Sequence, residues 1–410
     1  MALRDSGVDS IAVNAEGAIA FTRALVRVPS TNDPRLGRSE QEAARLVADL
    51  MRSWGWQPEV SEAAPGRPNV VAVVDGGGGP GPTVLFEGHT DVVTEGALDT
   101  WTVDPFGAEI TGGRLYGRGA ADMKSGVAAM LYGVRALQET GPFPGRVIVA
   151  ALADEEGLML GVHHFVDSGL AAGVDGAIVC EPEEGEVCPV SKGALRLRID
   201  LHGRMAHGAM PQHARNPVAV LGPLLTSLRG YDAELRQAGG SHEHLGPVYL
   251  TPTVVDAGTQ EQMNVIPAHA AVCVDVRTIP GTDHKAITDR VAALARAAAE
   301  PDEVSAEVSV LVDRPPVDTP AEDGVVRALA AAHQEVTGEP PRYGGVPGTT
   351  DGTVLTHHGG VPSVVYGPGG KWIAHQADEY VEVDDIARCA RVYATAARTF
   401  LCDTDRYRSE

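Results

Sequence analysis

Cysteines are few in this chain, and long apolar stretches are missing altogether. The five cysteines are scattered, include no CxxC pair and are odd in number. Such a set favours reduced thiols in the cytoplasm over a disulfide framework. No apolar run approaches the roughly 20 residues of a membrane-spanning helix, so no such helix is expected. Residues 1–14 lack the basic start, apolar stretch and small-residue cleavage site of a secretory signal, and we expect a frayed leader there.

Basic residues are also in short supply. The 410 residues contain 33 Lys and Arg against 55 Asp and Glu, which gives a formal net charge of -22. This charge argues against nucleic acid and anionic membranes as partners. An acidic surface also repels anionic substrates, so any site for a substrate carboxylate must be a local cationic pocket.

The length of the chain favours two domains. In the first part, strands are expected at 69–75, 83–87, 146–153 and 176–180, and helices at 16–28, 39–54, 124–139 and 163–168. The helix at 39–54 is expected to start with a capping box formed by Ser39 and Glu42. Short apolar strands that alternate with helices predict an α/β sheet covered on both faces.

The pattern changes after Pro189. Strands are expected at 195–201, 248–255, 270–278 and 305–312, and helices at 217–228 and 285–299. This order predicts a small α+β sandwich inserted into the first domain. The proline-rich segment 313–320 is expected to be the return linker, and helices at 323–336 and 384–401 with a strand at 361–366 complete the first domain. The predicted domains are 1–189 with 314–410, and 190–313.

Acidic residues and histidines follow the ends of several predicted strands. They are His89 and Asp91, then Asp122, then Glu155 and Glu156, then Glu181. Taken singly, each is typical of a loop, a surface or a helix start. Ligand sites of open α/β sheets lie outside the carboxyl ends of the strands, so together these residues predict one polar site. His375, in a late loop, could complete it.

Five segments in this order resemble the M20 metallopeptidase family. They are GHTDVV (88–93), GRGAADMKSG (117–126), DEEG (154–157), CEP (180–182) and AHQADEYV (374–381). The family includes succinyl-diaminopimelate desuccinylase, acetylornithine deacetylase, aminoacylase-1 and glutamate carboxypeptidases. The resemblance covers residues 21–401. It implies a zinc-peptidase-like catalytic domain with a mixed sheet covered by helices, an inserted ferredoxin-like lid and dimerisation domain, and a homodimer.

The resemblance also implies a pair of metal ions. His89, Asp122 and Glu181 would surround one ion, and Asp122, Glu156 and His375 the other, with Asp122 shared between them. Nitrogen and oxygen ligands without thiolate favour two divalent ions, most readily zinc, with cobalt or manganese tolerated. The Asp122–Met123 peptide bond is expected to be cis, as in the family.

Further roles come from the same resemblance. Asp91 would orient the imidazole of His89, and Glu155 would be the general base. His207, in the segment 202–211, would reach the active site of a partner subunit and stabilise an oxyanion there; a structural histidine is the alternative.

Four substrate contacts are expected as well. Asn264 would bind the substrate amide, Arg277 would bind a carboxylate unless it forms a structural ion pair, and Gly348 and Thr349 would cradle a carboxylate with their backbone.

The predicted activity is hydrolysis of the amide bond of an N-acyl amino acid by metal-activated water. A carboxypeptidase or dipeptidase that acts on a small peptide with a free carboxylate stays open, as does a non-catalytic relative that only binds metal or metabolite. Desuccinylases of the family carry a run of arginines where this chain reads Ser191-Lys192-Gly193-Ala194. A GxSxG nucleophile elbow is absent from the sequence.

Overall fold

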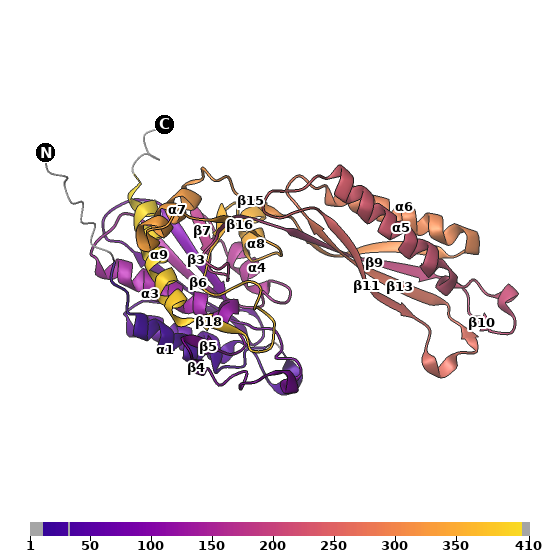
Figure 1. The fold of residues 1–410 in the computed structure, drawn as a ribbon, viewed down its shortest axis with the longest axis horizontal. Coiled ribbons are helices and arrows are strands. Elements are labelled where there is room, and N and C mark those ends of the chain that lie inside the picture. The colour runs from indigo at the N-terminus through magenta and orange to yellow at the C-terminus, as the bar shows by residue number, and fades with distance from the viewer. Residues whose placement is uncertain (1–10, 32, 404–410) are drawn as a thin grey trace. The chain divides into compact units, whose positions relative to one another are not determined.

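A computed structural model describes residues 11–31 and 33–403 (Figure 1). The chain forms two compact units, which we describe separately. The first takes the described residues of Met1–Pro189, Thr319–Gly344 and Thr350–Glu410, and the second takes Val190–Asp318 and Gly345–Thr349. Of the expected N-terminal leader, residues 1–10 lie outside the described residues. Residues 11–14 belong to the folded chain, because Ile11 is buried in the hydrophobic core.

The first unit is built on a mixed sheet. Its strands in spatial order are β1 (Glu59–Ala64), β2 (Arg67–Asp75), β6 (Arg146–Leu152), β3 (Thr83–His89), β7 (Gly176–Val179), β17 (Ser363–Val365) and β8 (Val187–Ser191). The neighbours β6, β3, β7 and β17 run parallel, so their carboxyl ends share one edge. All residues of β3 are buried, as expected for a strand covered on both faces.

Helices cover this sheet. They are α1 (Ala15–Val26), α2 (Gln41–Ser53), α3 (Ser125–Glu139), α4 (Leu160–Asp167), α7 (Gly324–Thr337), α8 (Gly352–His357) and α9 (Val383–Cys402). Figure 1 shows α3 and α9 side by side against the sheet, and both contact β3. The helices α4 and α8 contact each other and, respectively, β2 and β7. This mixed sheet with helical layers confirms the α/β class predicted from the alternation of strands and helices.

The start of α2 corrects one expectation. The helix begins at Gln41 and its N-cap is Glu40, while Ser39 Oγ lies 3.4 Å from the Gln41 amide nitrogen. The predicted capping box of Ser39 and Glu42 is therefore wrong. The physical reason is tertiary, because the Glu40 side chain turns inward to pair with the buried Arg67 guanidinium at 2.6 Å.

Short elements complete the first unit. A small antiparallel sheet joins β4 (Ile110–Thr111), β5 (Arg114–Tyr116) and β18 (Tyr380–Glu382). Single turns of 3-10 helix occur at Pro34–Leu36 and Leu98–Thr100, and a π turn at Ala120–Lys124 leads into α3. Two further short strands, β15 (Val317–Asp318) and β16 (Tyr343–Val346), lie where the chain passes between the two units.

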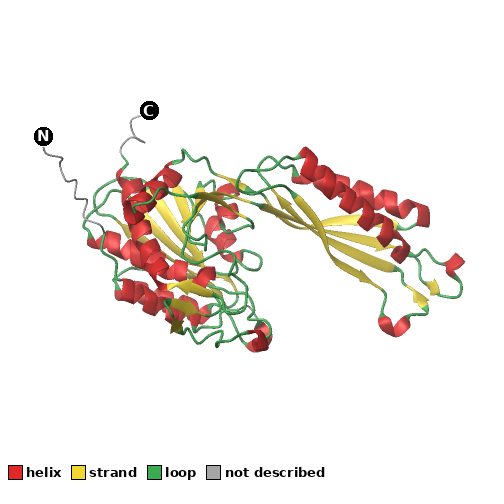
Figure 2. Ribbon diagram, viewed as in Figure 1, coloured by secondary structure: helices red, strands yellow, loops and turns green. Residues whose placement is uncertain are grey.

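The second unit is a one-sided sandwich. Its antiparallel sheet has the order β11 (Tyr249–Ala257), β13 (His269–Thr278), β9 (Gly193–His202) and β14 (Ser305–Arg314), and α5 (Pro217–Ala238) and α6 (His284–Ala299) pack on it. Figure 2 shows both helices on the same face. The chain order β9-α5-β11-β13-α6-β14 is the ferredoxin-like split βαβ arrangement that was expected. Alternate residues of β9, beginning with Leu195 and Leu197, are buried under the helices.

The long helix α5 extends ten residues beyond the predicted 217–228. A tip of the second unit carries the two-residue strands β10 (Ala206–His207) and β12 (Val265–Ile266), with 3-10 turns at Pro211–His213, Gln260–Gln262 and Glu300–Asp302. Within residues 11–31 and 33–403, every helix is too short or too polar to span a bilayer.

Candidate metal centre

Three of the expected metal ligands follow strand ends at one edge of the first unit's sheet. His89 is the last residue of β3, Glu156 follows β6, and Glu181 follows β7. Because β3 lies parallel to both β6 and β7, these ends are adjacent. Separate chain segments therefore meet at one edge of the sheet, which we call the rim, as the position of ligand sites in open α/β sheets predicts.

Asp122 reaches this rim from the π turn before α3. The Asp122–Met123 peptide bond is cis, as the family resemblance implied. The two oxygens of the Asp122 carboxylate face different histidines. Oδ1 lies 3.1 Å from Nε2 of His89, and Oδ2 lies 3.2 Å from Nε2 of His375.

Two groups of side chains thus share Asp122. In the first group, Nε2 of His89 also lies 3.5 Å from Oε1 of Glu181. In the second, Nε2 of His375 lies 2.8 Å from Oε1 of Glu156. Within each group the candidate ligand atoms all lie within 4.8 Å of one another. Atoms bonded to one zinc ion at about 2.0–2.2 Å lie at most about 4.4 Å apart, so each group fits a single ion after small side-chain adjustments.

The charges at the rim also fit cations. Burial lowers the pKa of His89, but Glu181, Asp122 and Asp91 raise it more, and the net pKa is well above the usual value. Hydrogen bonds to Asp122 and Glu156 raise the pKa of His375 to about 10. Burial, followed by the charge of Asp122, raises the pKa of Glu181 to about 8.

The pKa of Asp122 shifts in the opposite direction. Burial raises its pKa, but hydrogen bonds from His375 and His89 lower it more, so the net pKa is below the usual value. Protons on the imidazoles thus balance a cluster of buried carboxylates. A divalent ion in each group would replace those protons as the balancing charge, which is how metal binding displaces protons from ligands.

Asp91 contacts the imidazole of His89 with its backbone oxygen as well as with its carboxylate. Nδ1 of His89 lies 3.0 Å from the backbone oxygen of Asp91 and 3.5 Å from its carboxylate oxygen Oδ1. The Asp91 carboxylate accepts hydrogen bonds from the amide nitrogens of Glu155 at 3.2 Å and Glu156 at 3.1 Å. Asp91 therefore fixes the Nδ1–H tautomer of His89 through its backbone and orients the 155–156 turn through its side chain.

Glu155 lies beside the two ligand groups. Its side chain is largely buried, with 8% of the residue exposed. Burial and then the charges of Glu181 and Glu156 raise its pKa well above the usual value, an effect that the neighbouring His89 partly offsets. The structure brings Glu155 close enough to His89, Glu156 and Glu181 for their charges to act on its carboxylate.

Glu379 and Arg118 form a second layer that the sequence reasoning missed. Oε1 of Glu379 accepts the amide N–H groups of Ala121 at 2.9 Å and Asp122 at 3.0 Å. Its Oε2 pairs with Arg118 at 2.5 Å, and Arg118 also donates to the backbone oxygen of His375 at 3.2 Å. This pair fixes the backbone of two expected ligands. Both residues lie in segments quoted for the resemblance, so that location was the available signal.

A buried arginine also holds the DEEG turn. Arg67 pairs with Glu40 at 2.6 Å and with Oδ1 of Asp154 at 2.6 Å. Oδ2 of Asp154 accepts the amide N–H of Leu158 at 3.1 Å. Arg67 thus connects the start of α2 to the turn that carries Glu155. The position of Arg67 in the sequence did not predict this role.

The remaining expected site residues belong to the second unit. His207 is exposed, and its Nδ1 accepts the amide N–H of Ala209 at 3.0 Å. Asn264 is exposed as well. It lies next to the His207 segment, because its backbone oxygen accepts the N–H of Gly208 at 2.7 Å. Arg277 is the second-to-last residue of β13 and pairs with Asp275 at 2.7 Å. Gly348 and Thr349 are half-buried in the 345–349 segment.

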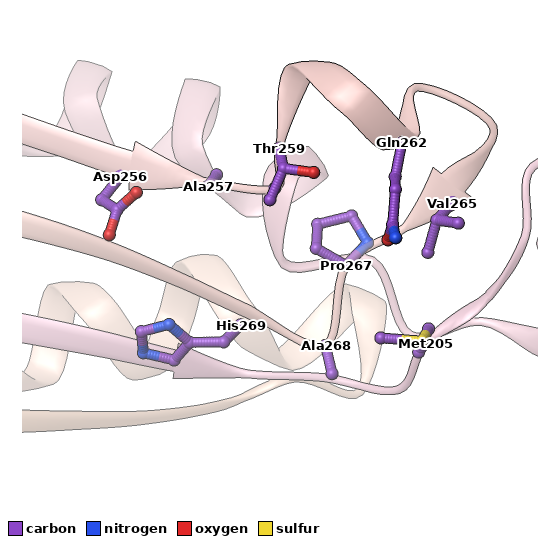
Figure 3. A pocket seen from close by; sticks show the side chains of 10 residues that line it. Met205, Asp256, Ala257, Thr259, Gln262, Val265, Pro267, Ala268 and His269 are labelled. Atoms are coloured by element: carbon purple, nitrogen blue, oxygen red, sulfur yellow. The ribbon is translucent and has the colours of Figure 1, made fainter.

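A hollow of about 350 Å³ lies next to the β10–β12 tip of this unit (Figure 3). Its lining is formed by Met205, Asp256, Ala257, Gly258, Thr259, Gln262, Val265, Pro267, Ala268 and His269. His269 points toward Asp200, with Nε2 2.8 Å from Oδ1. Among the residues that the structure describes, none of these five expected site residues lines the hollow, although His207 and Asn264 are close in sequence to Met205 and Val265.

Known proteins resemble this chain over most of its length. The sequence model of peptidase family M20/M25/M40 matches residues 85–399, more than half of the chain. A succinyl-diaminopimelate desuccinylase of Methylorubrum extorquens (strain PA1) is 33% identical over 392 residues, which cover 92% of this chain and 96% of that protein.

Solved structures share the fold. The M20 family metallo-carboxypeptidase Sso-CP2 from Sulfolobus solfataricus superposes with a TM-score of 0.76 at 19% identity and covers 93% of this chain and 99% of its own. A dinuclear metal binding peptidase from the M20 family of Bacillus subtilis superposes with a TM-score of 0.71 at 18% identity and covers 94% and 98%. At these identities the likeness shows the fold alone.

Proposed function

The chain belongs to peptidase family M20/M25/M40 and is a metal-dependent hydrolase, and on this premise we propose that it removes the acyl group of an N-acyl amino acid with two metal ions. The observation that carries the proposal is the shared position of Asp122. Its carboxylate oxygens face His89 on one side and His375 on the other. The activity in the name of the 33% identical relative supports a deacylase of the desuccinylase type.

In this proposal His89, Asp122 and Glu181 hold one ion, and Asp122, Glu156 and His375 hold the other. Imidazole and carboxylate ligands without thiolate favour zinc, with cobalt or manganese as alternatives. Bound ions would lower the pKa of a water molecule and polarise the scissile carbonyl. Asp91 keeps Nδ1 of His89 protonated, so that Nε2 presents a lone pair to the ion.

Glu155 is the proposed proton carrier. It would accept a proton from the attacking water and return it to the leaving amine. Its burial keeps bulk water from competing for that proton. The Asp91 carboxylate fixes the backbone on which Glu155 stands, through the hydrogen bond from the Glu155 amide.

His207 is the proposed oxyanion donor in a homodimer. Because Nδ1 of His207 accepts an N–H, the proton of the neutral imidazole resides on Nε2. That N–H is a donor suited to a developing oxyanion in a partner subunit. We assign the first unit to catalysis and the second to the lid and dimer contact. The five free thiols support a cytoplasmic location.

Substrate contacts are proposed at Asn264, Arg277, Gly348 and Thr349. Arg277 pairs with Asp275 through Nε, so it would bind a substrate carboxylate through its terminal amino groups. The acyl group is the open part of the proposal. Lys192, within the segment where desuccinylases carry arginines, is 4% exposed, and its ammonium donates to the backbone oxygen of Pro247 at 2.8 Å. Because this cation binds the backbone, we do not assign it to a succinyl carboxylate. Because the acyl group is not assigned, a carboxypeptidase or dipeptidase that acts beside a free carboxylate is the second candidate.

The test is a panel of N-succinyl, N-acetyl, N-formyl and N-aroyl amino acids with dipeptides. Each is assayed after chelation and after reloading with zinc, cobalt or manganese. We expect chelation to abolish turnover and one acyl class to dominate after reloading. Hydrolysis of dipeptides alone would favour the second candidate, and full activity in the chelated protein would refute the metal mechanism.

Glu155→Ala tests the proton carrier. We expect turnover to fall by at least about 100-fold while metal content stays at two ions for each chain. The matched control is Glu139→Ala at the exposed end of α3, which should keep wild-type turnover. A Glu155→Ala enzyme that turns over at the control rate would remove the assignment.

A further inference from the structure

The two halves of the candidate metal centre differ in how firmly the structure holds them. The side chain of His89 is 1% exposed and stands at the end of a buried strand. The side chain of His375 is 51% exposed. It stands in the segment 366–379 between β17 and β18, which runs as turns and bends. The position of His375 therefore depends on what anchors this segment.

Contacts on the carboxyl-terminal side of His375 hold that end of the segment. Asp378 accepts the amide N–H and the hydroxyl of Thr102, each at 2.8 Å. Glu379 follows with its bonds to the backbone of the π turn. This side is tied to the segments that carry Asp122.

Contacts on the amino-terminal side tie the segment to the residues after Glu181. The backbone oxygen of Gly369 accepts the amide N–H of Glu184 at 2.9 Å. At Gly367 the two segments approach so closely that a Cβ atom would lie 2.5 Å from the backbone oxygen of Glu181. The two segments are in direct contact at Gly367 and Gly369, eight and six residues before His375.

One side-chain anchor reinforces this contact. The ammonium of Lys371 lies 2.5 Å from Oε2 of Glu183 and 3.2 Å from Oε2 of Glu186. The side chains of Lys371 and Glu183 are only 13% and 3% exposed. Water therefore screens this ion pair much less than it screens a surface pair.

The residues that surround the Lys371 ammonium have the composition of a cation site. Ligand atoms of Glu183, Glu186 and Cys188 lie within 4.8 Å of one another. The Cys188 thiol donates to Oε2 of Glu183 at 3.4 Å and helps to fix the carboxylate. The ammonium of Lys371 lies against both carboxylates, so the chain supplies its own cation to this cluster.

We propose that Lys371 is a positioning residue for the metal centre. By binding Glu183 and Glu186 it fixes the segment that carries His375 against the segment that carries Glu181. One ligand of each proposed ion is thereby set relative to the other. The inference rests on the proposed two-metal function, and it concerns the ion held by His375 most directly, because that ligand is the exposed one.

Lys371→Met and Lys371→Arg test the role. The metal-free proteins are titrated with Zn²⁺ by calorimetry, and the imidazole signals are followed by NMR with labelled histidine, with His375→Ala identifying the His375 signal. We expect Lys371→Met to weaken the binding step reported by His375 by about 10–100-fold, the usual range for partners that orient metal ligands. The step reported by His89 should change little, and Lys371→Arg should restore most of the loss.

Two controls separate positioning from general destabilisation. Glu183→Gln combined with Lys371→Met removes the ammonium and its more buried carboxylate partner, while Glu186 keeps Arg342 at 3.9 Å. The anchor is still missing, so the His375 step should stay weak. Lys285→Met removes an exposed lysine paired with Asp289 in the second unit and should leave both steps unchanged.

The outcomes are distinct. If the wild-type protein binds fewer than two ions, the proposed function fails. If it binds two ions and Lys371→Met, or the double variant, binds both with wild-type affinity, the proposed function stands and the positioning role of Lys371 is refuted. An equal loss at both steps in all the Lys371 variants would also refute it, because it would indicate a general loss of structure.

Discussion

Gly126 brings two parts of the candidate metal centre together. It is the second residue of α3, four residues after Asp122, and it faces the backbone next to Glu181. A Cβ atom on Gly126 would lie 2.0 Å from the backbone oxygen of Cys180 and 3.1 Å from its carbonyl carbon. Because the obstacle is backbone, rotation of a side chain cannot relieve the clash. Gly126→Ala should therefore push α3 away from the end of β7.

The size of the effect follows from the distances. To reach ordinary contact at 3.4 Å, the added methyl group and the Cys180 oxygen must separate by about 1.4 Å. Overpacking a tight interior costs about 1–3 kcal/mol, against a gain of at most about 1 kcal/mol from the helix propensity of alanine. With the full propensity gain subtracted, the net loss of stability should reach up to about 2 kcal/mol. Metal–ligand distances stay within about 0.2 Å of their usual values. A shift of the backbone beside Glu181 should therefore also weaken binding of the proposed ion at Glu181.

Urea denaturation of the metal-free protein and zinc titration measure the two effects. The matched control is Gly230→Ala in α5, where an added Cβ meets open space. That variant should be more stable than wild type by up to about 1 kcal/mol and should bind zinc normally. If Gly126→Ala matched the control in both measurements, the close approach of α3 and β7 would be refuted.

Two further variants probe the layer behind the ligands. Arg67→Met leaves the fully buried Glu40 without its cation and should lower the free energy of unfolding by about 3–5 kcal/mol, whereas Arg45→Met, in an exposed pair, should change it by less than about 1 kcal/mol; equal losses in chemical denaturation would contradict the burial argument. Glu379→Leu strands two backbone N–H groups next to the metal centre and should cost at least about 2 kcal/mol and weaken zinc binding, while Glu382→Leu, whose side chain is 43% exposed, serves as its control. Normal zinc affinity in Glu379→Leu would show that these hydrogen bonds do not position the ligands.

Much of the architecture could be predicted from local patterns. The continuous apolar strands around Leu85 and Val149 indicated a sheet covered on both faces, and the alternation around Leu197 indicated a sheet covered on one face. Both predictions are confirmed. Local patterns gave a wrong prediction where a residue distant in the sequence determines the contact. Ser39 was expected to cap α2, but the buried charge of Arg67 draws Glu40 inward and makes it the N-cap residue instead.

The candidate site shows the same division. Strand ends in sequence order were enough to predict that His89, Glu156 and Glu181 would meet, because parallel strands end at one edge. The roles of Arg118 and Glu379 could not be predicted from spacing, since 261 positions separate these partners along the chain. The carboxylate of Asp91 was expected at His89, where Oδ1 lies 3.5 Å from Nδ1, but its bonds to the amides of the 155–156 turn, 64 and 65 positions away, could not be predicted from spacing.

The sequence alone determined the fold class, the family and the identity of the residues at the rim of the sheet. Those properties follow from apolar periodicity and from short motifs, which act over a few residues. Only the tertiary structure decided which atoms of those residues meet and what holds them there, namely the two-sided carboxylate of Asp122, the support from Glu379 and Arg118, and the anchor at Lys371. Hydrogen bonds and buried ion pairs act over about 3 Å in space regardless of separation along the chain, so a linear pattern carries little information about them.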